Sequence, residues 1–270
     1  MRDAISHIAT AFSGLVRLPV SAGGPSAAVT RGDASAFLGW PTVATVLCWF
    51  GLVMAGVWLG RLSFSILPSS AALLRALLQI LVANIAGACF LWWRLPSLAK
   101  ASLHELGLRW PAARDWGIFG AAAGIIVLAE LATGLVRALM HTRASEGFYP
   151  GTSGLASYLA LHGNAVPFMI FFAFIIVFVL PFAEELFLRG LMFRALRLRM
   201  AWLSAALIVA LISGHGSAVF WVLLIFVALD VVVSWAYERT GNLVVTMLVH
   251  GVSNLVLLLI AAIPILAGGR

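Results

Sequence analysis

Two adjacent glutamates and an arginine interrupt a long apolar stretch of the sequence. Glu184 and Glu185 lie near the end of this stretch, and Arg189 follows one helical turn later. On a helix Arg189 shares a face with Glu185 and can pair with it, whereas Glu184 is rotated by about 100° and is available to hold a water molecule. Two adjacent carboxylates in a low dielectric do not both ionise easily, so the pair suits general acid or base chemistry. The alternative is a helix end at the membrane interface, with solvated charges.

A histidine and an asparagine share one face of a second apolar stretch. His250 and Asn254 are four residues apart, which places both on the same side of a helix. One side chain can transfer a proton and the other can donate hydrogen bonds, a combination that suits stabilisation of an oxyanion. A hydrogen bond between helices is the alternative.

A further histidine, His215, lies between Gly214 and Gly216. The flanking glycines allow another backbone or a substrate to approach closely. A structural residue at a helix break is the alternative for this position.

The composition indicates that these groups lie in a membrane. Apolar residues make up 63% of the 270 residues and charged residues 10%, and the mean hydropathy is +1.07. These values exclude an ordinary soluble domain. We attribute the net charge of +7 to lysine and arginine that face anionic lipid on the cytoplasmic side, and do not expect a nucleic-acid partner.

The fold predicted from these patterns is all-α, a polytopic transmembrane bundle of about seven helices. A spanning helix needs about 20 mainly apolar residues. The positive-inside rule favours a cytoplasmic N-terminus, in what we expect to be the cell (inner) membrane. The predicted spans cover about residues 40–60, 73–93, 116–140, 166–188, 201–219, 220–237 and 243–267.

Three regions follow from this division. Residues 1–38 form a cytoplasmic segment whose spacing allows a short interfacial helix and a linker. Residues 39–165 hold accessory transmembrane helices, and residues 166–267 hold the catalytic core.

Ionisable side chains within a bilayer are costly, at about 2.5–3.5 kcal/mol each. We therefore expect the polar groups on three separate helices to converge at one buried site. Glu130 and Asp230 have no comparable companions in the sequence. We expect both to form hydrogen bonds inside the bundle, outside the site, and expect Glu238 to form an interfacial pair with Arg239.

The order and spacing of these motifs resemble the CPBP family, the CAAX-protease and bacteriocin-processing proteins that include the CAAX prenyl endopeptidase. Its Glu-Glu-x-x-x-Arg motif matches 184–189, and its His-x-x-x-Asn motif matches 250–254. Its Phe-x-x-x-His motif is matched only at His215, because Leu211 stands at the phenylalanine position. The resemblance covers about residues 166–260 and implies a four-helix catalytic core surrounded by additional helices.

The resemblance also implies an activity, that of an intramembrane endopeptidase. Glu184, assisted by His215, would activate a water molecule for attack on a peptide carbonyl. His250 and Asn254 would then stabilise the oxyanion.

The Glu185–Arg189 pair would orient the first glutamate. The implied substrates are proteins or peptides, including lipidated and membrane-anchored ones, and the implied mechanism uses no metal and no other cofactor.

Three other interpretations remain open. A zinc-dependent variant would use Glu184, His215 and His250 as ligands, but the helix-borne His-Glu-x-x-His pattern of zinc proteases is absent from the sequence. A non-catalytic membrane protein would bind peptides in the same cavity, as an immunity factor does. A proton-coupled transporter also uses buried glutamates and histidines, although no internal repeat is detectable here.

Overall fold

The computed structural model describes residues 39–66, 72–139, 170–171, 173–213 and 220–266. Every regular element within these ranges is helical, which confirms the all-α prediction. The elements are α4 (Trp40–Ile66), α5 (Ala72–Ala99), α6 (Ala113–Leu139), η2 (Ile175–Val179), α9 (Leu180–Glu185), η3 (Leu186–Phe193), α10 (Arg194–Arg197), α11 (Trp202–Ser213), α12 (Phe220–Thr240) and α13 (Leu243–Leu266). The N-terminal segment predicted over 1–38 lies outside the described residues.

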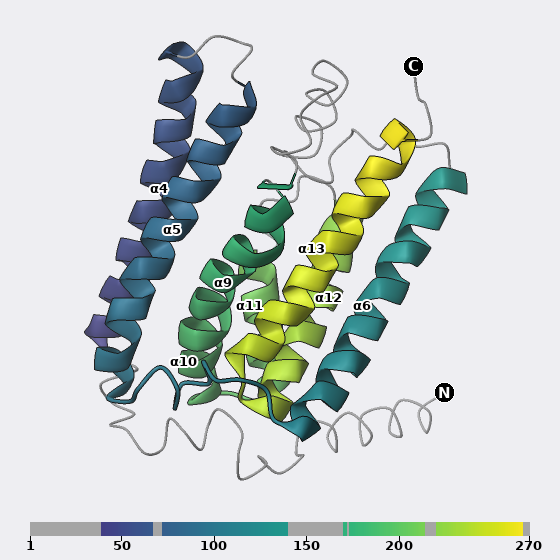
Figure 1. Cartoon of the computed structure of the whole chain (residues 1–270). Coiled ribbons are helices and arrows are strands. Elements are labelled where there is room, and N and C mark those ends of the chain that lie inside the picture. The colour runs from purple at the N-terminus through teal and green to yellow at the C-terminus, as the bar shows by residue number, and fades with distance from the viewer. Residues whose placement is uncertain (1–38, 67–71, 140–169, 172, 214–219, 267–270) are drawn as a thin grey trace.

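The helices lie side by side as a bundle of two layers (Figure 1). One layer runs from the α4–α5 hairpin through α9 and α13 to α6, and α11 and α12 lie behind α9 and α13. The elements η2, α9, η3 and α10 follow one another as a single rod, so the described residues form seven helical rods. This number agrees with the predicted bundle.

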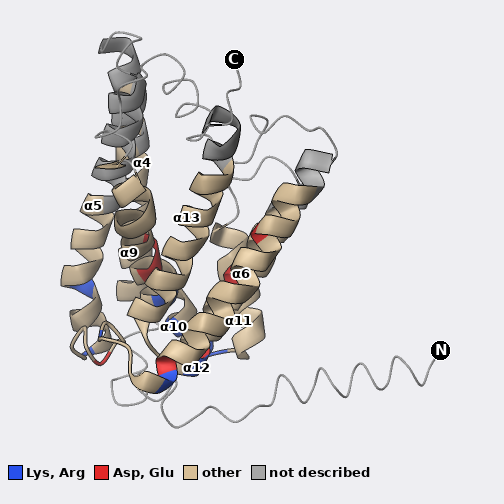
Figure 2. Cartoon of the chain, turned by 45° about the vertical axis from the view of Figure 1, so that its right-hand side comes forward, with Lys and Arg blue, Asp and Glu red and all other residues tan. Residues whose placement is uncertain are grey.

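The outer surfaces of the bundle are apolar. Large hydrophobic side chains such as Trp93, Leu128 and Leu211 are exposed, an arrangement that is stable when lipid covers them. Two described stretches are long and apolar enough to cross a membrane on their own, Ala113–Leu135 and Leu243–Ile260. Several charged residues lie at the lower end of the bundle, where α5 ends and α6 begins (Figure 2). The bundle is therefore that of a helical membrane protein.

The rod that carries the two adjacent glutamates is irregular on both sides of them. The segments η2 and η3 are π-helical, and the regular α9 between them is six residues long. Such π-helical turns are uncommon and often occur at functional sites. The predicted span over 166–188 thus continues to Arg197. The part of the predicted span over 201–219 that the structure describes is helical from Trp202 to Ser213, and residues 214–219 lie outside the described residues.

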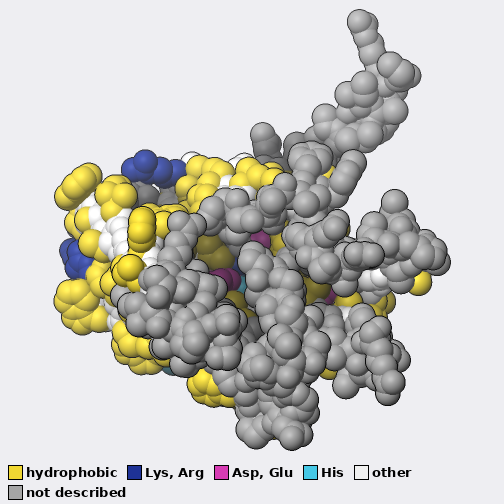
Figure 3. All heavy atoms as spheres, turned by 90° about the horizontal axis from the view of Figure 1, so that it is seen from above, with side chains coloured by type: hydrophobic (Ala, Val, Ile, Leu, Met, Phe, Trp, Pro, Cys, Tyr) yellow, Lys and Arg dark blue, Asp and Glu magenta, His cyan; other side chains and the backbone are white. Residues whose placement is uncertain are grey.

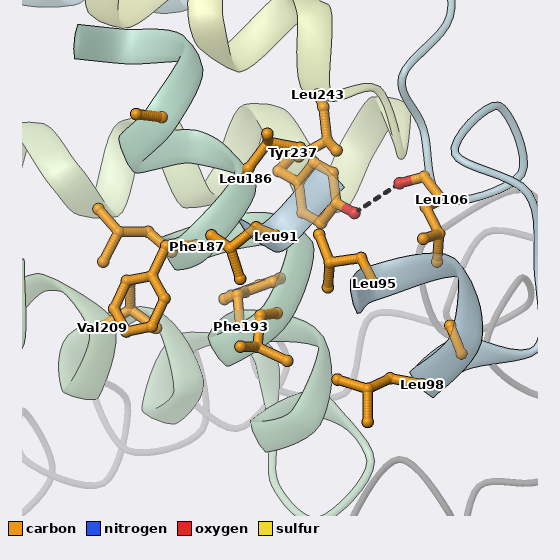
Figure 4. Packing of buried hydrophobic residues seen from close by; sticks show 14 of the residues in the cluster. Leu91, Leu95, Leu98, Leu106, Leu186, Phe187, Phe193, Val209, Tyr237 and Leu243 are labelled. Carbon is orange, nitrogen blue, oxygen red and sulfur yellow. Dashed lines mark hydrogen bonds between the residues drawn. The ribbon is translucent and has the colours of Figure 1, made fainter. Parts of the chain in front are cut away.

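The main hydrophobic core fills the space between α5, η3 and α11. Leu91, Leu95, Leu186 and Phe193 are fully buried there and are drawn in Figure 4. A second, smaller buried cluster joins α6, α12 and α13. Together the two clusters hold the motif-bearing helices at fixed positions, because apolar side chains at native density resist displacement.

The lower end of the bundle is closed by the connection between α5 and α6. Arg194 Nη2 donates to the Leu106 carbonyl oxygen at 2.7 Å, and Arg194 Nε donates to the Tyr237 hydroxyl at 2.5 Å. Tyr237 also donates to the Leu106 oxygen (dashed in Figure 4). The backbone N–H of Leu243 donates to Gly107 O at 2.8 Å. These bonds fix the start of α13.

The predicted interfacial pair of Glu238 with Arg239 is wrong. Glu238 accepts two hydrogen bonds from Arg197, at 2.8 and 3.0 Å, and so joins α10 to α12. Arg239 follows Glu238 directly, and consecutive residues of a helix point in different directions.

Gly107 is required by this connection. Its φ is +103°, and an added Cβ atom would lie 2.3 Å from Gly241 O. We expect Gly107→Ala to lower the free energy of unfolding by about 2 kcal/mol or more, because backbone strain and a clash with backbone add together. Thermal unfolding of the purified protein in detergent measures the change. Gly117→Ala is the control, since Gly117 lies in α6 with nothing within 4 Å of an added Cβ; equal stability of the two variants contradicts the prediction.

Candidate active site

A buried arginine joins two carboxylates from different helices. Arg189 Nη1 donates to Glu185 Oε1 at 2.8 Å, as the helical spacing predicted. Arg189 Nη2 lies 2.7 Å from Asp230 Oδ1 on α12. The side chains of Arg189 and Glu185 are fully buried, and that of Asp230 is nearly so. Each of these three groups therefore has a partner of opposite charge, as a charged group in a low dielectric requires.

His250 connects this chain of charges to Glu184. Its Nδ1 lies 2.9 Å from Glu185 Oε1, the same oxygen that Arg189 binds. Its Nε2 lies 3.7 Å from Glu184 Oε2. The two adjacent glutamates thus face different nitrogen atoms of one imidazole ring.

The two glutamates differ in their access to solvent. The side chain of Glu184 is 33% exposed, whereas that of Glu185 is fully buried. Figure 3, seen from the end of the bundle where α13 ends, shows acidic and histidine side chains between the apolar helices. Glu184 is therefore the carboxylate that water can reach, while Glu185 is bound in the ion pair with Arg189.

The asparagine of the last motif is bonded to backbone. Asn254 Nδ2 donates to the carbonyl oxygen of Ile176 in η2 at 2.9 Å. One residue further along η2, Val177 O would lie 2.6 Å from a Cβ added at Gly251. The glycine thus lets α13 approach η2 closely enough for the Asn254 bond.

The structure brings four of the six predicted residues together. Glu184, Glu185 and Arg189 on one rod meet His250 on α13. Asn254 lies one turn further along α13, where it bonds Ile176 O. The sixth, His215, lies outside the described residues.

The sequence interpretation was wrong to leave Asp230 outside the site. A guanidinium has five N–H donors, and one carboxylate does not satisfy them. This excess of donors was the available signal for a second acidic partner. Glu130, by contrast, forms a hydrogen bond inside the bundle as expected, with Ser253 of α13 as the donor.

Loss of the arginine should destabilise the bundle strongly. Arg189→Ala leaves Glu185 and Asp230 buried without their shared cation, which we expect to cost about 3–5 kcal/mol. Thermal unfolding in detergent measures the loss. Arg114→Ala removes an exposed arginine 3.5 Å from Asp115 and should cost about 1 kcal/mol or less. Equal effects of the two substitutions contradict the structural role of the buried pair.

Comparison with known proteins finds one family that matches part of the chain. Residues 165–256 match the family model described as type II CAAX prenyl endopeptidase Rce1-like. No curated protein and no solved structure matches the chain. The matched segment contains all the motif residues, and the family is one of membrane proteases. Residues 165–256 are therefore similar to a family of CAAX-type membrane proteases.

Proposed function

We propose that this protein is an intramembrane endopeptidase in which Glu184 activates the attacking water. The peptide bond that it hydrolyses lies near the C-terminus or the membrane-proximal part of a protein or peptide substrate. The observation that carries the proposal is the position of His250, whose ring is held by buried Glu185 and presented to the more accessible Glu184.

The distance between Glu184 and His250 suits a shared water molecule. The 3.7 Å between Glu184 Oε2 and His250 Nε2 is too long for a direct hydrogen bond. A water oxygen beside this line can lie about 2.8 Å from both atoms, at hydrogen-bond distance. Glu184 would then take the proton of that water as it attacks the peptide carbonyl.

The contact with Glu185 determines which nitrogen of the His250 ring faces the reacting groups. A carboxylate only accepts hydrogen bonds, so Nδ1 carries a proton where it meets ionised Glu185. Nε2 is then the atom that faces the reacting groups. In the doubly protonated ring Nε2 donates a hydrogen bond and would stabilise the oxyanion of the tetrahedral intermediate.

Asn254 retains a donor for the same task. Its amide has two N–H groups, and one of them donates to Ile176 O. The bond to backbone fixes the plane of the amide, and the second N–H would donate to the oxyanion. A donor held in advance costs no reorganisation during the reaction.

Two roles are open to His215 in the proposed reaction. As a base it would assist Glu184, as the family resemblance implies. As the third ligand of a zinc ion with Glu184 and His250, it would make the enzyme a metalloprotease. We propose the first role, because Arg189 and Glu185 already orient the glutamate–histidine pair.

Cleavage of membrane-anchored peptides by the purified protein in detergent tests the proposal. We expect Glu184→Gln to lower kcat by at least about 100-fold, because the amide cannot take the proton of water. His250→Ala should lower it similarly, and a chelator should leave the wild-type rate unchanged. Glu238→Gln is the matched control: this carboxylate lies at the base of the bundle, and its replacement should retain cleavage.

Other outcomes select the alternatives. Loss of wild-type cleavage with the chelator, restored by zinc, supports the metalloprotease. If the folded wild type cleaves no peptide of a broad library but binds some of them as tightly as Glu184→Gln does, the protein is a peptide-binding factor. Proton-coupled flux in vesicles that disappears in Glu184→Gln supports the transporter.

A further inference from the structure

A further buried acidic side chain lies near the site. Glu130 on α6 is 2% exposed. Its Oε1 accepts a hydrogen bond from the Ser253 hydroxyl, and its Oε2 has no hydrogen-bond partner among the residues that the structure describes. An acidic group within an apolar helix is costly, and the chain of charges around Arg189 does not include it.

Ser253 belongs to the same helical turn as the two motif residues of α13. His250 contacts Glu185 on α9, and Asn254 donates to Ile176 O in η2. Ser253 follows His250 by three residues and points about 60° to its other side, where α6 lies. One turn of α13 is thus bonded to three neighbouring segments.

We propose that Glu130 is a positioning residue, which through Ser253 fixes the rotation of α13 and so the location of His250 Nε2 beside Glu184. This inference rests on the proposed function. Apolar contacts lie on both sides of this bond: Gly134 of α6 faces Ile260 of α13, and Ile126 of α6 belongs to the same buried cluster as Val249 of α13. Apolar contacts are not directional and allow a helix to rotate, whereas a hydrogen bond restricts its angle.

The reaction should be sensitive to this rotation. The proposed water contacts Glu184 and His250 at once, across a gap of 3.7 Å. Misplacement of a catalytic group by about 1 Å can cost about 100-fold in rate. An apolar cavity of about 530 Å³ lies between η2, α9 and α13, and we expect the apolar part of the substrate to bind there. Neither Glu130 nor Ser253 lines this cavity, so substrate affinity should change little.

A direct electrostatic effect is the competing explanation, because Glu130 also interacts with His250 through its charge. Glu130→Gln separates the two explanations. The glutamine side chain retains an oxygen that accepts the Ser253 hydroxyl but carries no charge. A positioning role survives this substitution, and a charge effect does not.

The test measures kcat and KM for cleavage by the full-length protein. Ser253→Ala and Glu130→Leu should each lower kcat by about 10–100-fold, with KM within about 2-fold of the wild-type value. The kcat of the double variant should be no lower than that of either single variant. Glu130→Gln should cleave at close to the wild-type rate. Thr133→Val is the control on the same helix and should have the wild-type rate, since the Thr133 hydroxyl donates to Ala129 O of α6 itself and, among the described residues, does not join α6 to α13.

Hydrogen exchange of the backbone amides around 250–254 gives a second readout. Exchange should be faster in Ser253→Ala, which is small enough to fold if Glu130→Leu does not, and unchanged in Glu130→Gln. The positioning role is overturned if Ser253→Ala keeps the wild-type kcat, or if Glu130→Gln lowers kcat as much as Glu130→Leu does. If the wild type cleaves nothing, the proposed function itself fails, and the positioning role fails with it.

Discussion

A single buried guanidinium organises the functional half of this bundle. Arg189 is fully buried and bonds Glu185 on its own rod and Asp230 on α12. An unpaired charge in this environment would be strongly destabilising, so the two helices are held where both carboxylates reach the arginine. Glu185 is in turn the residue that His250 contacts, which brings α13 into the same arrangement. Glu184 then needs no structural partner and is left accessible.

Irregular backbone makes this arrangement possible. A regular helix uses its carbonyl oxygens internally, whereas η2 offers Ile176 O to Asn254. Gly251 lets α13 come close to the neighbouring Val177 O. The hydrophobic cores on either side resist displacement, so the site lies on a rigid frame. Such rigidity suits a reaction in which acid, base and oxyanion donors must already be in position.

The sequence predicted those parts of the site that depend on helical spacing. The Glu185–Arg189 bond and the common face of His250 and Asn254 follow from a separation of four residues, which a helix fixes whatever surrounds it. The all-α bundle followed from composition and from the length of the apolar stretches. The contact between the two motifs was an inference from the cost of charge in lipid, and the structure places them together.

The remaining features depend on how the helices pack, which spacing does not encode. Asp230 has no acidic or basic neighbour on its own helix, and only the position of α12 beside Arg189 gives it a partner. Glu238 bonds Arg197 on another helix in place of adjacent Arg239. The π-helical turns carry no distinctive residue pattern. These contacts join residues 41 positions apart in the chain, beyond the reach of any local rule.

The most direct test of the central claim is the structure of the complex with a peptidyl aldehyde, whose hydrated form mimics the tetrahedral intermediate. We expect one hydroxyl oxygen of the hydrate to lie about 2.6–3.2 Å from Glu184 Oε2 and the other, at the position of the oxyanion, to lie at that distance from His250 Nε2, while Glu185 remains bonded to Arg189. A hydrate bound away from these two side chains, or a metal ion held between them, would contradict the central claim.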